Sequence, residues 1–181
     1  MSQIRRAVFF DKDGVINALV DRGEHFFLAG KRERLTAPWT PEEMRIFEPV
    51  RGVVHAVRAR GYLAIVITNQ PDVSYGVMEL ASLKTILQTV RSLGFDDLYA
   101  CLHGRDEGCR CRKPMPGMLL MASSEWNIDL ERSYFLGDTE ADTIAARAAG
   151  CTSVIIDREY NAQVQANARI TRHDELLDLL P

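Results

Sequence analysis

The chain has 181 residues, of which 46% are hydrophobic and 26% are charged, a composition typical of one globular domain. Its 22 Lys and Arg against 25 Asp and Glu give a formal charge of −3, without the basic excess that is typical of nucleic-acid binding. The apolar runs are too short for a signal peptide or a membrane span. We therefore expect a single cytoplasmic domain with neither a nucleic-acid nor a membrane partner.

Short apolar runs rich in β-branched and aromatic residues alternate with segments whose apolar residues recur at helical spacing. This alternation is typical of an α/β fold in which helices cover both faces of a parallel sheet. The predicted strands are residues 6–10, 63–68, 98–101, 134–136 and 153–156. Helices are predicted around residues 50–57, 83–93, 118–126 and 144–148.

Residues 18–46 do not follow this alternation, because they are polar, charged and interrupted by Gly and Pro. They are predicted to form a long loop, in which Thr40 followed by Pro41 begins a short helix. A loop of this length inside a compact domain usually has a function.

Ligands of parallel α/β sheets bind beyond the carboxyl ends of the strands, so the residues after each predicted strand are the first candidates for chemistry. The first strand is followed by Asp11-Lys12-Asp13-Gly14. Its two aspartates could hold a divalent cation, or act as a nucleophile and an acid–base group. Taken alone, the pattern is also common in ordinary turns.

Two further segments carry groups that could bind a phosphate. Thr68-Asn69-Gln70 ends the second strand with neutral hydrogen-bonding side chains, and Arg112-Lys113 precedes a predicted helix with two positive charges. Such a Lys could offset the charge of a phosphoryl group during its transfer. A polar turn and an exposed charge pair are the alternatives.

The fourth predicted strand is followed by Asp138, with Asp142 four residues later. Acidic residues are also favoured at a helix N-terminus, which is a sufficient structural account of this segment alone. In chain order, however, the segments resemble the four motifs of the haloacid dehalogenase (HAD) superfamily of phosphotransferases over nearly the whole chain. The matching segments are Asp11-x-Asp13-Gly14, Thr68, Lys113 and Gly137-Asp138-x-x-x-Asp142.

The resemblance implies a three-layer, Rossmann-like fold without a large cap domain, and a Mg²⁺-dependent phosphomonoesterase. Asp11 would be the nucleophile that forms an aspartyl-phosphate, and Asp13 the general acid and base. Asp138, the Asp11 carboxylate and the Asp13 carbonyl would hold Mg²⁺.

The same resemblance assigns roles to the remaining motif residues. Thr68 would hydrogen-bond the phosphoryl group and Lys113 would offset its charge. Asp142 would act from behind, orienting the Lys or a metal-bound water.

Three Cys and one His lie within eleven positions, in a segment that we call the zinc loop (residues 101–111). Cys101, His103, Cys109 and Cys111 match the ligand set of a closed, structural Zn²⁺ site, and free buried Cys is the alternative. Because Lys113 follows directly, zinc binding would fix where this Lys points. Cys151 lies apart and is interpreted as a core residue.

The zinc loop joined to these motifs resembles the HAD branch that contains D-glycero-D-manno-heptose 1,7-bisphosphate phosphatase and histidinol-phosphate phosphatase. The resemblance implies a small monomer whose substrate is a small phosphorylated sugar, namely heptose 1,7-bisphosphate losing its 7-phosphate, with residues 18–46 on the substrate side. We expect Arg112 to contact a second anionic group of the substrate, and Asn69 and Gln70 to orient it.

The chain departs from the heptose phosphatase pattern at three places. Residues 18–46 are longer, Tyr75 stands where an Arg is expected, and Thr139 stands where a Lys is expected. The short zinc loop keeps histidinol phosphate, or another small metabolite, as an alternative substrate. A zinc-containing module that only binds phosphate is the non-enzymatic alternative.

Overall fold

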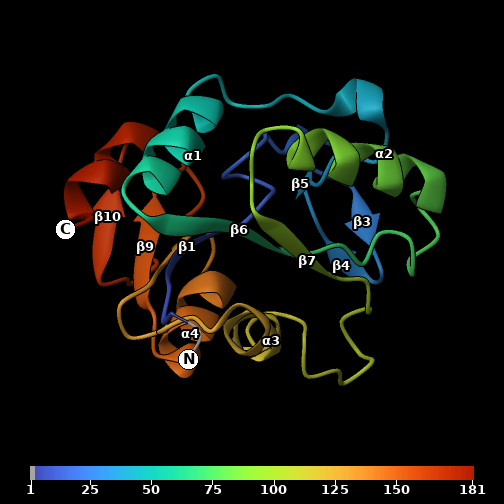
Figure 1. Ribbon diagram of the computed structural model, residues 1–181. Helices are drawn as coiled ribbons and strands as arrows, with labels where there is room; N and C mark the ends of the chain where they lie inside the picture. The colour runs from blue at the N-terminus through green and yellow to red at the C-terminus, as the bar shows by residue number, and fades with distance from the viewer. Residues whose placement is uncertain (1–2) are drawn as a thin grey trace.

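The computed structural model describes residues 3–181, and its central feature is a six-stranded parallel sheet in the order β10-β9-β8-β1-β6-β7 (Figure 1). The strands of this sheet are β1 (Arg6–Phe10), β6 (Tyr62–Asn69), β7 (Asp97–Cys101), β8 (Tyr134–Gly137), β9 (Thr152–Ile156) and β10 (Ala168–Ile170). The helices of the described residues are α1 (Val50–Ala59), α2 (Leu80–Arg91), α3 (Gly117–Trp126) and α4 (Glu140–Ala149). The predicted α/β fold is therefore confirmed. No helix within residues 3–181 is both long and apolar enough to cross a bilayer.

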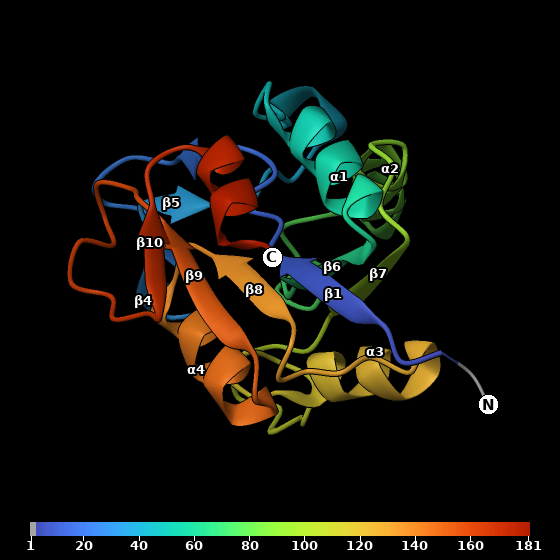
Figure 2. The same cartoon turned by 60° about the vertical axis from the view of Figure 1, so that its left-hand side comes forward.

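The central strand β1 shows why the sheet is covered on both faces. Its side chains alternate between two buried layers: Val8 and Phe10 join the core with α1, whereas Ala7 and Phe9 join the core with α3 and α4. Figure 2 shows α1 and α2 on one side of the sheet and α3 and α4 on the other. A strand buried on both faces needs an uninterrupted apolar run, which is what residues 7–10 provide.

Neither β10 nor the 3-10 helix η2 (His173–Leu179) follows from the sequence pattern. Strand β10 has three residues, of which only Ile170 is buried, so it lacks a recognisable apolar run. It becomes a strand because β9 offers a free edge, on which Ala168 pairs with Val154. Pairing between distant segments therefore outweighs the weak local pattern.

Residues 18–46, which we call the flap, are not the irregular loop that the composition predicts. They form two nested antiparallel hairpins. The pairs are β2 (Val20–Asp21) with β5 (Leu35–Thr36), and β3 (Phe27–Leu28) with β4 (Lys31–Arg32). Strands of two residues are too short to show an alternating pattern, so the sequence does not reveal them. The predicted short helix is present as the 3-10 helix η1 (Pro41–Glu43), and residues 3–181 contain no cap domain.

Polar contacts join the flap to the body of the domain and also hold the flap itself together. The Trp39 indole N–H donates a hydrogen bond to Asp72 Oδ1 at 3.2 Å. The Arg22 guanidinium lies 3.8 Å from the centre of the Trp39 ring and forms an ion pair of 2.6 Å with Glu43. The Trp39–Asp72 hydrogen bond therefore joins the flap to the segment after β6, whereas the two Arg22 contacts hold the flap itself together.

Candidate active site

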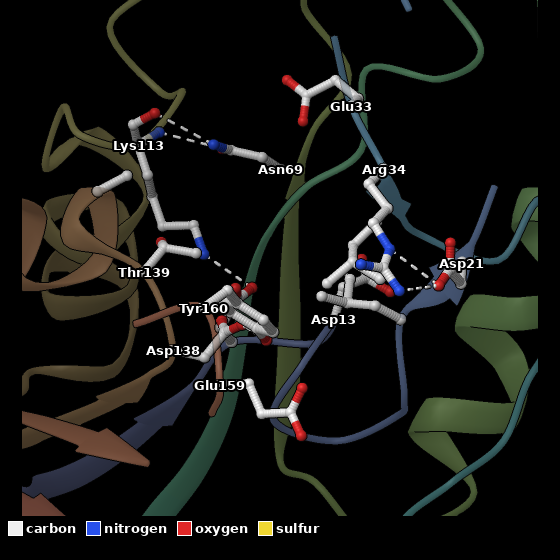
Figure 3. A pocket seen from close by; sticks show the side chains of 14 residues that line it. Asp13, Asp21, Glu33, Arg34, Asn69, Lys113, Asp138, Thr139, Glu159 and Tyr160 are labelled. Carbon is white, nitrogen blue, oxygen red and sulfur yellow. Dashed lines mark hydrogen bonds and ion pairs between the residues drawn. The ribbon is translucent and has the colours of Figure 1, made fainter. Parts of the chain in front are cut away.

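The carboxyl ends of β1, β6 and β8 meet at a pocket of about 840 Å³, a volume typical of small-molecule sites (Figure 3). Of the predicted site residues, five line it: Asp11, Asp13, Asn69, Lys113 and Asp138. Thr68, Gln70 and Asp142 are buried next to the pocket, and Arg112 and the four candidate zinc ligands lie on the zinc loop or directly after it. The pocket therefore lies at the carboxyl ends of the strands, where ligands of parallel sheets bind. Which of the side chains there face it is seen only in the structure.

A buried ion-pair network lies at the base of the pocket. Lys113 Nζ lies 2.7 Å from Asp11 Oδ1 and 2.6 Å from Asp142 Oδ1, and its side chain is 3% exposed. It also donates to the Ile67 carbonyl at 3.1 Å. Burial disfavours the charged ammonium, but Asp11 and Asp142 outweigh this effect and raise the Lys113 pKa.

The neighbouring segments fix the position of this lysine. Asn69 Oδ1 accepts a hydrogen bond from the Lys113 backbone N–H at 3.0 Å, and Asn69 Nδ2 donates to the Lys113 carbonyl at 3.1 Å. Asp142 Oδ2 accepts from the Thr139 N–H at 2.9 Å, which caps the start of α4. Asn69, predicted to orient substrate, holds the Lys113 backbone in this structure, and Asp142 pairs with the Lys113 ammonium.

Three carboxylates lie close enough to share a cation. Oxygens of Asp11, Asp138 and Asp142 lie within 4.8 Å of one another, with Lys113 as the positive partner of two of them. Burial raises the pKa values of Asp11 and Asp138, and the neighbouring carboxylates add to this effect. Asp138 Oδ1 is buried without a hydrogen-bond partner among the described residues. Three carboxylates facing a single lysine leave an excess of negative charge, and carboxylate oxygens are the ligands that Mg²⁺ prefers.

Gly14 allows the first strand-end loop to approach Asp138. Its φ is +83°, and a Cβ at this position would lie 2.0 Å from Asp138 Oδ2. Any other residue would displace the carboxylate, so the Asp-x-Asp-Gly turn needs Gly both for backbone conformation and for space.

Asp13 is held by donors from two directions. Gln70 Nε2 donates to Asp13 Oδ2 at 2.6 Å, and Asn17 Nδ2 donates to Asp13 Oδ1 at 3.0 Å. Lys12 Nζ pairs with the same Oδ1. Gln70 also donates to Thr68 Oγ1 at 3.0 Å, and both Gln70 and Thr68 are fully buried. Gln70 therefore contacts Asp13 in this structure, and no motif in the sequence marks Asn17.

Arg112 directly follows the zinc loop and does not line the pocket. Its Nη1 donates to the His103 carbonyl at 3.2 Å. Its contact with a second anionic group of the substrate stays a prediction.

The zinc-loop ligands converge as predicted. Cys101 Sγ lies 3.6 Å from Cys109 Sγ and 3.2 Å from Cys111 Sγ, and His103 Nδ1 lies 3.2 Å from Cys111 Sγ. Ligands about 2.3 Å from a tetrahedral centre lie about 3.8 Å apart, so only a small expansion of the cluster separates these distances from a zinc site. Cys151 is buried in the hydrophobic core, away from the cluster.

Several pocket residues were not predicted. Tyr160, which follows β9, donates a hydrogen bond from its hydroxyl to Asp138 Oδ2. The flap contributes Arg34, whose guanidinium pairs with Asp21 at 2.7 Å and with Glu24 at 2.6 Å, all three being largely exposed. Tyr160 lies in the segment that follows the carboxyl end of β9, so its position in the sequence could have marked it as a candidate pocket residue. Nothing in the flap sequence marks Arg34.

Comparisons with known proteins identify relatives of this chain. Residues 110–180 match the model of the HAD-hydrolase-like family. The chain is 30% identical to a D-glycero-beta-D-manno-heptose-1,7-bisphosphate 7-phosphatase of Helicobacter pylori, over 96% of this chain and 87% of that protein. A Yersinia pestis protein of the same name is 31% identical, over 87% of this chain and 83% of its own length.

A solved structure has the same fold. The crystal structure of D,D-heptose 1,7-bisphosphate phosphatase from B. bronchiseptica, complexed with magnesium and phosphate, aligns with a TM-score of 0.80 and 22% identity. The alignment covers 96% of this chain and 97% of that one. The chain therefore belongs to the HAD superfamily of phosphoric monoester hydrolases, in the family that includes the two heptose-bisphosphate phosphatases above.

Proposed function

We propose that the protein is a Mg²⁺-dependent phosphomonoesterase that removes the 7-phosphate of D-glycero-D-manno-heptose 1,7-bisphosphate. The observation that carries the reaction type is Asp11, a pocket-lining carboxylate paired with the buried Lys113 beside the unpartnered oxygen of Asp138. The substrate follows from the names of the relatives.

In the first step, a carboxylate oxygen of Asp11 attacks phosphorus and the bond from phosphorus to the sugar oxygen breaks. Asp13 gives its proton to that leaving oxygen. Lys113 favours the ionised form of Asp11 and offsets charge on the phosphoryl oxygens. Thr68, expected to donate to one of these oxygens, is fully buried and does not line the pocket, so its contact stays a prediction.

In the second step, water attacks the phosphorus of the aspartyl-phosphate and loses a proton to Asp13, which the first step has left deprotonated. The bond between Asp11 and phosphorus breaks, phosphate leaves, and the Asp11 carboxylate is regenerated. Gln70 and Asn17 hold the Asp13 carboxylate in place through their hydrogen bonds to it.

Asp11, Asp138 and the Asp13 carbonyl are the groups that would hold Mg²⁺. When bound, this cation supplies Lewis-acid stabilisation of the phosphoryl oxygens and lets two anions approach each other. Asp142 contributes by orienting Lys113, with which it pairs at 2.6 Å.

The zinc loop has a structural role in this proposal: Zn²⁺ on its three Cys and one His would fix the direction in which Lys113 leaves the loop. Metal analysis tests it. We expect about one zinc per chain in the native protein and loss of zinc in Cys109→Ser. A folded, active protein without zinc would contradict this role.

Histidinol phosphate is a second candidate substrate, because one feature of the pocket favours a positively charged organic group. Asp21 and Glu33 of the flap, together with Glu159, line the pocket, against Arg34 as the one basic residue on that side (Figure 3). An amine-bearing phosphomonoester would complement this wall better than a second phosphate does.

Phosphate release from a substrate panel decides between these candidates. The panel holds both anomers of heptose 1,7-bisphosphate, histidinol phosphate, other sugar phosphates and an aryl phosphate, each with Mg²⁺ and with a chelator. We expect fast turnover of one heptose anomer only when Mg²⁺ is present. Turnover of histidinol phosphate alone would keep the Asp11 chemistry and replace the substrate, and no release from any compound would favour a phosphate-binding module.

A further inference from the structure

The segment after β9, residues 157–161, forms part of the pocket wall and contacts the metal-ligand candidates. The Tyr160 hydroxyl donates to Asp138 Oδ2, and Asn161 Nδ2 donates to the Asp138 carbonyl at 2.7 Å. Arg158 Nε donates to the Gly14 carbonyl at 2.9 Å. One short segment is thus attached both to Asp138 and to the loop that carries Asp11 and Asp13.

The two carboxylate oxygens of Asp138 have different environments. Oδ2 accepts the Tyr160 hydroxyl, whereas Oδ1 is buried without a hydrogen-bond partner in the part of the chain that the structure describes. A carboxylate with one oxygen held by a donor cannot rotate freely about its side-chain bond. The donor therefore determines which oxygen remains available to a cation.

The position of Tyr160 is itself well determined. Asn161 is 2% exposed, and its Nδ2 also donates to the Ile156 carbonyl at 2.9 Å. Asn161 Oδ1 accepts from the Arg158 N–H at 3.0 Å, which closes the turn. Gly14 leaves room for the hydroxyl, since a Cβ there would lie 2.7 Å from it.

We propose that Tyr160 is a positioning residue of the Mg²⁺ site: its hydroxyl holds Asp138 Oδ2 so that Oδ1 is presented to the cation. Partners of this kind orient metal ligands, and their loss typically weakens metal binding by about 10- to 100-fold. The inference rests on the proposed function, because it assigns Mg²⁺ to the cluster of Asp11 and Asp138.

Direct Mg²⁺ binding, measured by isothermal titration calorimetry without substrate, tests this role. Tyr160→Phe removes only the hydroxyl, and we expect the Mg²⁺ dissociation constant to rise by about 10- to 100-fold. The thermal midpoint in the presence of a chelator should stay unchanged. Tyr160→Leu should weaken binding equally, because the hydroxyl and not the ring carries the role.

Tyr99→Phe is the matched control, because the Tyr99 hydroxyl donates to Glu125 at 2.6 Å, outside the pocket. Asp138→Asn should abolish binding. Mg²⁺ binding by Tyr160→Phe within about twofold of wild type, or tighter than wild type, would overturn the inference alone. Absence of Mg²⁺ binding by the wild-type protein would overturn the proposed Mg²⁺ function together with it.

Discussion

The two halves of the pocket are built differently. The inner half consists of buried carboxylates and Lys113 at the ends of parallel strands, where the Lys113 side chain is 3% exposed. The outer half includes flap residues such as Arg34, whose side chain is 55% exposed and pairs with exposed Asp21 and Glu24. Buried charges are costly unless they are paired, so the inner side chains are confined to positions in which they contact their partners. Exposed ion pairs contribute little to stability and confine their side chains less.

This difference separates chemistry from selectivity. The inner half needs a fixed arrangement of nucleophile, acid–base group and cation, which a parallel sheet provides at its strand ends. The outer half can change its sequence without disturbing the core, because loops carry function on a rigid scaffold. Three experiments test this comparison, and a fourth tests a buried histidine outside the pocket.

The largest effect is expected from Asp11→Asn. Loss of the nucleophile should lower kcat by at least about 1,000-fold, leaving the fold intact because the side chain keeps its shape. The same substitution in the outer half, Asp21→Asn, should leave kcat within about threefold. Phosphate release with Mg²⁺ measures both. Comparable losses in the two variants would remove the distinction between the halves.

Lys113→Met tests the energetics of the inner half. It leaves Asp11 and Asp142 buried without their cation, and we expect the free energy of unfolding in urea to fall by about 3–5 kcal/mol. Arg34→Met, the matched change in the outer half, should leave the unfolding midpoint unchanged, because water solvates Asp21 and Glu24. A loss below about 1 kcal/mol in Lys113→Met would show that the buried carboxylates do not need the lysine charge for stability, as is typical of exposed pairs.

Arg112→Ala tests whether Arg112 or Arg34 contacts the second phosphate of the substrate. We expect KM for heptose 1,7-bisphosphate to rise about tenfold, with an aryl phosphate unaffected, because a charge-assisted contact is lost only for the bisphosphate. Arg34→Ala should change KM by about twofold, since Asp21 and Glu24 already balance its charge. The opposite ranking would assign the anionic contact to the flap.

The smallest effect concerns pH and the buried His173. Its Nε2 lies 2.7 Å from the Val15 carbonyl, which can only accept, so Nε2 carries the proton of a neutral imidazole. Burial lowers the pKa of His173 below its ordinary 6.5. Below pH 6.5 the unfolded chain therefore binds more protons than the folded one, and stability falls as the pH drops.

We expect the thermal midpoint to fall by about 2–4 °C between pH 7 and pH 5 through this group. His173→Gln should flatten that dependence, whereas His55→Gln, at an exposed position, should leave it unchanged. An equal slope in wild type and His173→Gln would contradict the assignment.

Much of the inner half is predictable from the sequence, because each residue directly follows a strong apolar run. Asp11, Asp13 and Asp138 are examples, and the structure places all three on the pocket wall. Gln70 was assigned to substrate, yet it is fully buried and donates to Asp13. The direction of a side chain at a strand end depends on its neighbours, which the linear pattern does not contain.

The sequence by itself determined the parallel sheet, its order of strand-end groups and the cluster of three Cys and one His in the zinc loop, because periodicity and local spacing encode them. Tertiary structure alone decided the hairpins of the flap, the edge strand β10 and the contact of Tyr160 with Asp138. The flap strands have two residues each, too few to show a pattern, and the other two features join segments well separated in the chain: Tyr160 and Asp138, for example, are 22 residues apart. Local sequence preferences do not specify such pairings, which are specified by the packing of the whole domain.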